Sequence, residues 1–249
     1  METRVKDLVA SIDGILERQT LSTAEMRVLR GRLVFAESQI FGRVAGLHMQ
    51  QLSKYEHAVG DASLDDDVVE SLQFLRERIV LGGPRTALAE TGRVFHLYTD
   101  ACYEDSVGGL GAVLYDGHGN LMSFYSAQVN RDQVALLNPL GKETIILDLE
   151  ALAVLVACVS LLPAEGVFQN DRVVIFVDNE AVLARLVSGR GGGSIDNRIF
   201  GGVLNWEQET SVLAWYERVP SAANVADSPS RGNVSNLDPL LAINQCRCQ

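Results

Sequence analysis

Apolar residues recur at helical spacing through the first eighty residues of the chain. Residues 5–17 repeat with this period, and a second pattern follows the cap-like Ser22-Thr23-Ala24-Glu25. The period continues over residues 29–52, with breaks near two glycines, and returns over residues 68–79. We therefore expect a small helical region, closed by a linker at about 81–93 that contains a Gly-Gly-Pro sequence.

Beyond this linker the pattern changes to short apolar runs typical of β-strands. Strands are predicted at 94–99, 109–115 and 121–129, with the hairpin sequence Asp116-Gly117-His118-Gly119-Asn120 between the last two. The remaining predicted elements are a helix at 143–162, a strand at 173–177, helices at 180–187 and 196–209, a strand at 212–219 and a short helix or turn around Asp227. The nearly all-apolar strand at 173–177 is of the kind buried on both faces.

This order of elements predicts an α/β fold. A right-handed helical crossover would bring the fourth strand parallel to and beside the first. The result is a five-stranded mixed sheet of order 3-2-1-4-5, flanked by helices. We divide the chain into a helical region, residues 1–92, an α/β domain, residues 93–235, and a C-terminal tail, residues 236–249.

Composition supports a folded chain, since 47% of the residues are hydrophobic and 21% are charged. The net charge of −11 opposes nucleic-acid binding, because phosphate contacts normally leave a basic surface. From residue 94 onward there are nine basic and 18 acidic side chains, whereas residues 18–54 hold six basic and two acidic ones. A basic arm on an acidic domain is one interpretation, and a helix with a solvated charged face is the more common one.

The chain shows no sign of secretion or of a membrane span. Its start has no signal-peptide pattern, and its longest apolar run, residues 151–163, is too short to cross a bilayer. The four cysteines form no disulfide framework, and Cys246 and Cys248 make a lone pair at the tail. We expect an intracellular protein, in the nucleus or the cytoplasm, without a membrane partner.

Three acidic residues lie next to apolar segments. Two follow strands that should end at the same edge of the sheet, and the third lies within an apolar helix. Asp100 and Asp178 directly follow the apolar runs of the first and fourth strands, whose carboxyl ends should be neighbours. Paired aspartates of this kind suit Mg²⁺, although either one alone is explained as well by capping. Glu150 lies in an apolar helix and must be exposed, paired or metal-bound. Asp148 and Glu143 are its rivals, and periodicity does not choose among the three.

Five sequence blocks carry a resemblance to a known family. They are Tyr98-Thr99-Asp100-Ala101, Gly109-Leu110-Gly111-Ala112-Val113-Leu114, Leu149-Glu150-Ala151-Leu152-Ala153, Val177-Asp178-Asn179 and Asn224-Val225-Ala226-Asp227-Ser228-Pro229-Ser230-Arg231. In this order they resemble the ribonuclease H domain of retroelement reverse transcriptases. The last block is most similar to the DIRS-like, tyrosine-recombinase group of retrotransposons. Upstream, residues 29–36 and 41–43 resemble the helical connection that precedes this domain in those elements.

The resemblance implies a ribonuclease H-like fold and a metal-dependent endonuclease. Asp100, Glu150, Asp178 and Asp227 match the family's four acids, which would bind two divalent ions, Mg²⁺ or Mn²⁺. Metal-activated water would then cleave the RNA strand of an RNA–DNA hybrid and leave a 3′-hydroxyl. This match selects Glu150 on its helix and makes Asp148 and Glu143 surface residues.

Other residues and partners follow from the same resemblance. Asn179, Asn224 and Arg231 are candidates for contacts with substrate or for hydrogen bonds that support the acids, with capping as the alternative for the two asparagines. The loop ahead of Asp227 lacks the histidine found in many cellular ribonucleases H. The expected partners are an RNA–DNA hybrid and a polymerase domain outside this chain.

Two further hypotheses stay open. The acidic charge favours a catalytically inactive ribonuclease H-like scaffold or nucleic-acid-binding module. A different nuclease of the same fold class is disfavoured, because a 3′–5′ exonuclease would need a second acid at position 102, which is Cys102.

Overall fold

The chain folds into two compact units, Met1–Thr86 and Ala87–Gln249, in a computed structural model. The structure describes residues 2–37, 43–58, 62–81, 92–138, 145–190 and 194–238. Most of the predicted linker therefore lies outside the described residues, as does most of the predicted C-terminal tail.

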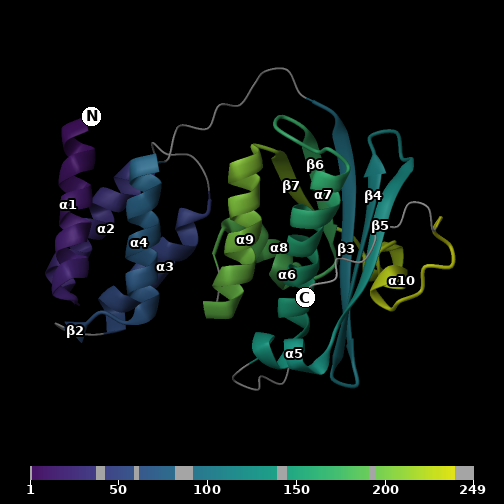
Figure 1. Ribbon diagram of the computed structural model, residues 1–249, viewed down its shortest axis with the longest axis horizontal. Coiled ribbons are helices and arrows are strands. Elements are labelled where there is room, and N and C mark those ends of the chain that lie inside the picture. Colours follow the sequence, from purple (N-terminus) through teal and green to yellow (C-terminus); the bar gives the residue numbers. More distant parts are fainter. Residues whose placement is uncertain are drawn as a thin grey trace. The chain divides into compact units, whose positions relative to one another are not determined.

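The described part of the first unit is built from helices and a small strand pair (Figure 1). Its elements are α1 (Glu2–Arg18), β1 (Thr20–Leu21), α2 (Thr23–Glu37), α3 (Ala45–Ala58), β2 (Ala62–Ser63) and α4 (Asp66–Leu81). Ile12, Leu33 and Leu72 are fully buried between the helices. The predicted cap is confirmed, since the Ser22 amide donates to Glu25 and the Glu25 amide donates back to the Ser22 hydroxyl. The helical pattern predicted over residues 29–52, with breaks near Gly42 and Gly46, belongs to two helices, α2 and α3.

The second unit contains a five-stranded mixed sheet. Its strands are β3 (Val94–Glu104), β4 (Val107–Asp116), β5 (Leu121–Val129), β6 (Arg172–Val177) and β7 (Leu213–Arg218). They lie in the order β5-β4-β3-β6-β7, so the predicted order 3-2-1-4-5 is confirmed. The β3–β4 and β4–β5 pairs are antiparallel, and β6 is parallel to both of its neighbours. This is the ribonuclease H-like arrangement.

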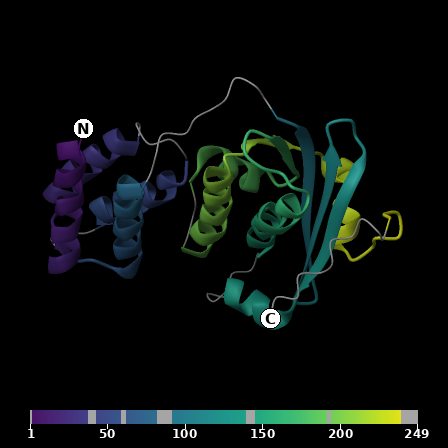
Figure 2. The same cartoon turned by 45° about the horizontal axis from the view of Figure 1, so that its top comes forward.

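Helices cover the two faces of this sheet unequally. The long helix runs as α6 (Ile146–Val156), a π-helical turn (Ala157–Leu161) and α7 (Leu162–Ala164). It lies with α8 (Glu180–Ser188) and α9 (Ser194–Thr210) on one face, whereas the short α10 (Asp227–Ser230) lies on the other (Figures 1 and 2). The elements α5 (Arg131–Leu137) and a 3-10 turn (Ser221–Ala223) complete the described part.

The thin cover on the α10 face corrects one expectation and leaves one tryptophan exposed. In β6, residues 173, 175 and 177 are buried but Val174 and Phe176 are only half-buried, so this strand is not buried on both faces. Phe176 instead stacks on Tyr98 of β3, with 4.5 Å between the ring centroids. On β7, Trp215 is 65% exposed, whereas Trp206 of α9 is buried. Core packing therefore accounts for only one of the two tryptophans.

Strand β3 is longer than the apolar pattern predicted. It runs to Glu104 and turns into β4 through Asp105 and Ser106, whose φ angles of 51° and 65° suit a two-residue hairpin. Its parallel partner β6 stops earlier, and the last β3–β6 pair is Tyr98 with Phe176. β3 thus continues past the end of this pairing, and Asp100 lies in that part of the strand.

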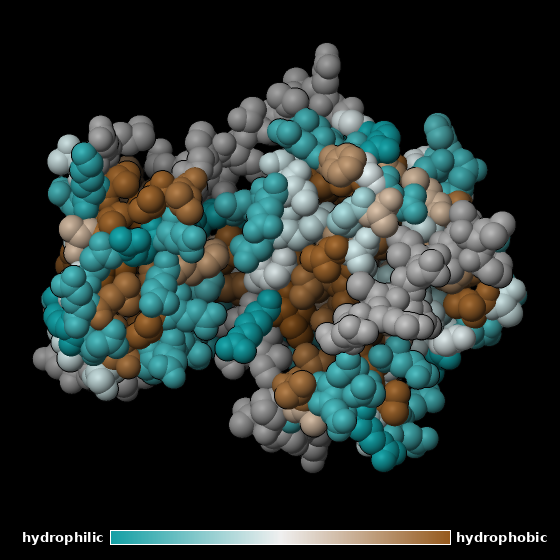
Figure 3. Space-filling model, in the orientation of Figure 1, coloured by the Kyte–Doolittle hydropathy of each residue, from teal (hydrophilic) through white to brown (hydrophobic). Residues whose placement is uncertain are grey.

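By length and apolar composition, one helix within the described ranges could cross a membrane, Ile146–Ala164. It is longer than the apolar run noted in the sequence because it also includes residues 146–150, with Asp148 and Glu150. In the fold, this helix packs on β3 and β4. Within the fold, 56% of the 18-residue apolar window in this helix is buried. Figure 3 shows apolar surface on both units, set among hydrophilic areas.

Candidate metal centre

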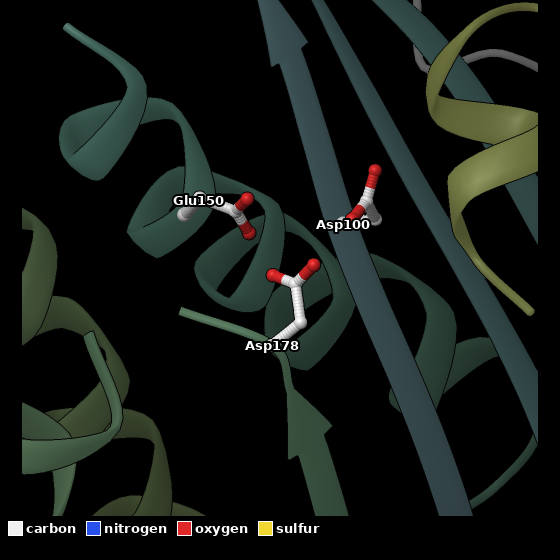
Figure 4. A group of neighbouring side chains, drawn as sticks. All are labelled: Asp100, Glu150 and Asp178. Carbon is white, nitrogen blue, oxygen red and sulfur yellow. The ribbon is translucent and has the colours of Figure 1, made fainter. Parts of the chain in front are cut away.

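Three of the four predicted acids come together. Asp100 lies in β3, Glu150 in α6, and Asp178 directly after β6. One carboxylate oxygen from each lies within 4.8 Å of the others. Figure 4 shows Glu150 and Asp178 facing each other beside the strand that carries Asp100. Side chains from three separate parts of the chain thus form one cluster of carboxylates at the point where β6 ends.

Burial makes this group electrostatically costly. Asp100 is 4% exposed and Glu150 is 5% exposed, whereas Asp178 is half-buried. Burial raises the pKa of Glu150 to about 9, with the charges of Asp100 and Asp178 adding to the shift and a backbone hydrogen bond from Ala101 opposing it. Burial likewise raises the pKa of Asp100 to about 6, against a hydrogen bond from Ser230. Clustered buried carboxylates of this kind call for a cation.

One atom of the group lacks a partner. The Oε2 atom of Glu150 is buried and has no hydrogen-bond partner among the described residues. Buried polar atoms are nearly always satisfied, and an orphaned one marks strain, chemistry or a missing ion. Glu150 also offers a carboxylate oxygen within 4.8 Å of oxygens from Asp100 and Asp178, and three such carboxylates fit a hard divalent cation such as Mg²⁺ or Mn²⁺.

Asp227 lies at the border of the group. It begins α10 and is not among the three acids whose oxygens converge. Its charge nevertheless raises the pKa of Asp100, so the two carboxylates are close enough to interact. Its Oδ1 atom accepts a hydrogen bond of 3.0 Å from Nε of Arg231. The structure thus places the fourth predicted acid beside the centre, in an ion pair.

The segment around α10 holds both oxygens of Asp100. The Asn224 side-chain amide donates to Oδ1 of Asp100 at 3.1 Å and to the Thr99 carbonyl at 2.9 Å. The Ser230 hydroxyl donates to Oδ2 of Asp100 at 2.5 Å. Asn224 also accepts from the Ala226 amide, so it supports the acid and shapes the turn at once.

Ser230 was not among the site residues predicted from the sequence. It stands in the final sequence block, three positions after Asp227, but a serine so near a helix end has no distinctive pattern. Only the docking of α10 onto the sheet brings its hydroxyl to Asp100.

Two glycines of β4 allow this docking. A Cβ atom at Gly109 would lie 2.0 Å from the Ser230 carbonyl oxygen, and one at Gly111 would lie 2.4 Å from the Ser230 amide nitrogen. Real Cβ atoms do not approach backbone so closely, so any larger residue would push α10 away. On the opposite face, a Cβ at Gly108 would meet the Leu149 side chain at 3.0 Å. Alternate residues of β4 therefore fit α10 and α6.

The remaining candidates have different surroundings. Asn179 caps α8, since its Oδ1 atom accepts from the Ala181 and Val182 amides at 3.0 and 3.2 Å, which is the capping alternative.

Asp148 is only 3% exposed, so the expectation of a surface residue is wrong. Residues 148–151 of α6 are all buried, because this part of the helix is covered on several sides. Glu143, the other residue considered in place of Glu150, lies outside the described residues.

Comparisons with known proteins give similarity to solved structures alone. No family model matches the chain, and no curated protein matches it. It is similar to LC11-RNase H1 in complex with an RNA/DNA hybrid, with 17% identity and a TM-score of 0.47, over 57% of this chain and 97% of that one. RNase H1 of the archaeon Halobacterium salinarum gives 17% identity and a TM-score of 0.45, over 57% of this chain and 98% of that one.

A longer structure also matches. The foamy viral protease-reverse transcriptase in complex with double-stranded DNA gives 11% identity and a TM-score of 0.30, over 85% of this chain and 34% of that one. At these values the similarities carry no weight for activity. The fold assignment rests on the strand order and register described above.

Proposed function

We propose that this chain is a metal-dependent endonuclease that hydrolyses the RNA strand of RNA–DNA hybrids. The observation that carries the proposal is the convergence of Asp100, Glu150 and Asp178, with a buried oxygen of Glu150 left without a partner. A buried cluster of carboxylates destabilises the fold unless a cation binds it. Cations bound in such a cluster can catalyse transfer or hydrolysis at phosphate.

The residues divide into those that would hold cations and those that position them. Asp100, Glu150 and Asp178 supply the converging oxygens, and Asp227 would complete a second ion's site from α10. When bound, two divalent ions would stabilise charge on the phosphate and lower the pKa of the attacking water. Asn224 and Ser230 fix the carboxylate of Asp100 through hydrogen bonds to its two oxygens. Glu150 must lose its proton before it can act as a ligand.

The substrate class rests on the sequence blocks that resemble retroelement ribonucleases H. Selection of RNA would come from contacts with 2′-hydroxyl groups and from the shape of the hybrid, rather than from base edges. Arg231 and Asn179 are the remaining candidates for contacts with substrate, since Asn224 is buried and bonded to Asp100. We propose that the protein acts inside the cell. We also propose that it belongs to, or is derived from, a reverse transcriptase of the DIRS-like group.

A cleavage assay tests this function. The full chain is incubated with a 5′-labelled RNA–DNA hybrid and Mg²⁺, with the same RNA alone, the RNA duplex and the DNA duplex as controls. We expect endonucleolytic products with 3′-hydroxyl ends from the hybrid alone, and none with Asp178→Asn. Binding of the hybrid without cleavage, by a correctly folded protein, would contradict the proposal and favour the inactive scaffold. Cleavage of the DNA duplex would contradict the proposed substrate.

A further inference from the structure

Arg231 places a positive charge beside the carboxylate group. It lies directly after α10, and its guanidinium joins two acids from separate elements. Its Nε atom donates to Oδ1 of Asp227 at 3.0 Å, and its Nη1 atom donates to Oε1 of Glu104 at 2.9 Å. Glu104 ends β3, four residues after Asp100. The arginine therefore ties the start of α10 to the strand that carries the central aspartate.

The charge of the same guanidinium also changes the pKa of a buried acid that it does not contact. The charge of Arg231 lowers the pKa of Asp100, while the charge of Asp227 raises it. The hydrogen bond to Asp227 raises the pKa of Arg231 further above its already high value, so the arginine stays charged at any working pH. In the protein without metal, Arg231 is thus a local counter-ion for a group of acids.

Asp227 stands apart from the other three acids and is paired with Arg231. Asp100, Glu150 and Asp178 have oxygens within 4.8 Å of one another, and Asp227 is outside that group with one oxygen bound to Arg231. A divalent ion and a guanidinium compete for the same carboxylate, because each needs its lone pairs.

We propose that Arg231 is a positioning residue that holds Asp227 in the metal-free protein and competes with the incoming divalent cation for its carboxylate. The inference rests on the proposed function and deepens it, since it concerns the fourth acid of that site. Arg231 and Asp227 are about half exposed, so the ion pair is weak enough to exchange. Once displaced, the guanidinium would stay tethered to Glu104 and remain beside the metal centre.

The test measures metal binding, with no nucleic acid present. Free Mn²⁺ is followed by electron paramagnetic resonance during titration of the full chain, and Mg²⁺ is then used to displace it. Arg231→Gln should bind Mn²⁺ about threefold to fivefold more tightly than the wild type, the gain expected from removing one exposed ion pair. Arg231→Lys, which keeps the charge but loses the forked geometry, should lie between the two.

Two controls separate this competition from a general change in charge. Arg172→Gln removes the same charge from an exposed residue at the opposite end of β6 from Asp178, and its Mn²⁺ affinity should stay within about twofold of wild type. In an Asp227→Asn background the gain from Arg231→Gln should vanish, because the carboxylate under competition is gone. Circular dichroism and thermal unfolding verify that each variant is folded.

The outcomes are distinguishable. If Arg231→Gln leaves Mn²⁺ affinity unchanged or weakens it, or if the gain persists undiminished with Asp227→Asn, the competition does not exist, while the proposed nuclease stands. If the wild type itself binds neither ion, the proposed metal centre falls and this inference falls with it.

Discussion

Replacement of Glu150 by glutamine should remove much of the loss of stability that the metal-free protein suffers as pH rises. Glu150 is 5% exposed, and its pKa is raised from 4.5 to about 9, first by burial and then by the charges of Asp100 and Asp178. The folded protein therefore keeps a proton that the unfolded chain loses at pH 4.5. The free energy of unfolding must fall as pH rises from about 4.5 to about 9 and level off above that.

The magnitude follows from the size of this window. Each pH unit within it removes about 1.4 kcal/mol, so at pH 7.5, three units above 4.5, the loss is at most about 4 kcal/mol. Relaxation around a buried group and entry of water reduce this, and about 2 kcal/mol is a realistic value. Glutamine does not titrate, although its buried amide costs about 1 kcal/mol where it lacks partners. Glu150→Gln should thus be about 1–3 kcal/mol more stable near pH 7.5 and no more stable than wild type near pH 4.5.

Urea unfolding in EDTA, followed by tryptophan fluorescence over this pH range, measures the effect. Both tryptophans, Trp206 and Trp215, lie in the second unit, so the signal reports on the unit that contains the acids. Glu209→Gln, an exposed glutamate of α9, is the matched control and should keep the wild-type slope. Parallel pH profiles for wild type and Glu150→Gln would refute the reasoning, because Glu150 would then be ionised at no cost.

Four further outcomes follow from the same geometry. Asp178→Asn should abolish hybrid cleavage while leaving the urea midpoint unchanged or higher, since it relieves repulsion among the acids; a clear fall in stability would argue for a structural role. Gly111→Ala should destabilise the second unit by about 1–3 kcal/mol by pushing α10 away, whereas Gly31→Ala, which points into open space, should not. Ser230→Ala should raise the pKa of Asp100 and weaken Mn²⁺ binding about tenfold, and unchanged affinity would show that its hydrogen bond is dispensable. Binding of Mg²⁺ near pH 7.5 should release protons from Glu150, so calorimetric heats should differ between buffers of different ionisation enthalpy; equal heats would contradict a protonated Glu150.

The sequence by itself determined the strand order of the sheet and most of the elements around it, although the short helix α5 was not predicted. Period-two and period-3.6 patterns reveal strands and helices, and the right-handed crossover leaves one place for β6, parallel to β3. That topology already put Asp100 and Asp178 near each other. The choice of Glu150 came from its sequence block, because a helix buried on several sides has no single polar face, and both Asp148 and Glu150 are buried.

Only the tertiary structure decided how α10 meets the sheet. Four residues form too short a helix to show any periodicity, and its position depends on backbone contact with Gly109 and Gly111. The hydrogen bond from Ser230 to Asp100 and the ion pair between Arg231 and Asp227 follow from this contact. Such contacts join residues more than a hundred positions apart or depend on side-chain direction, and local sequence patterns record neither.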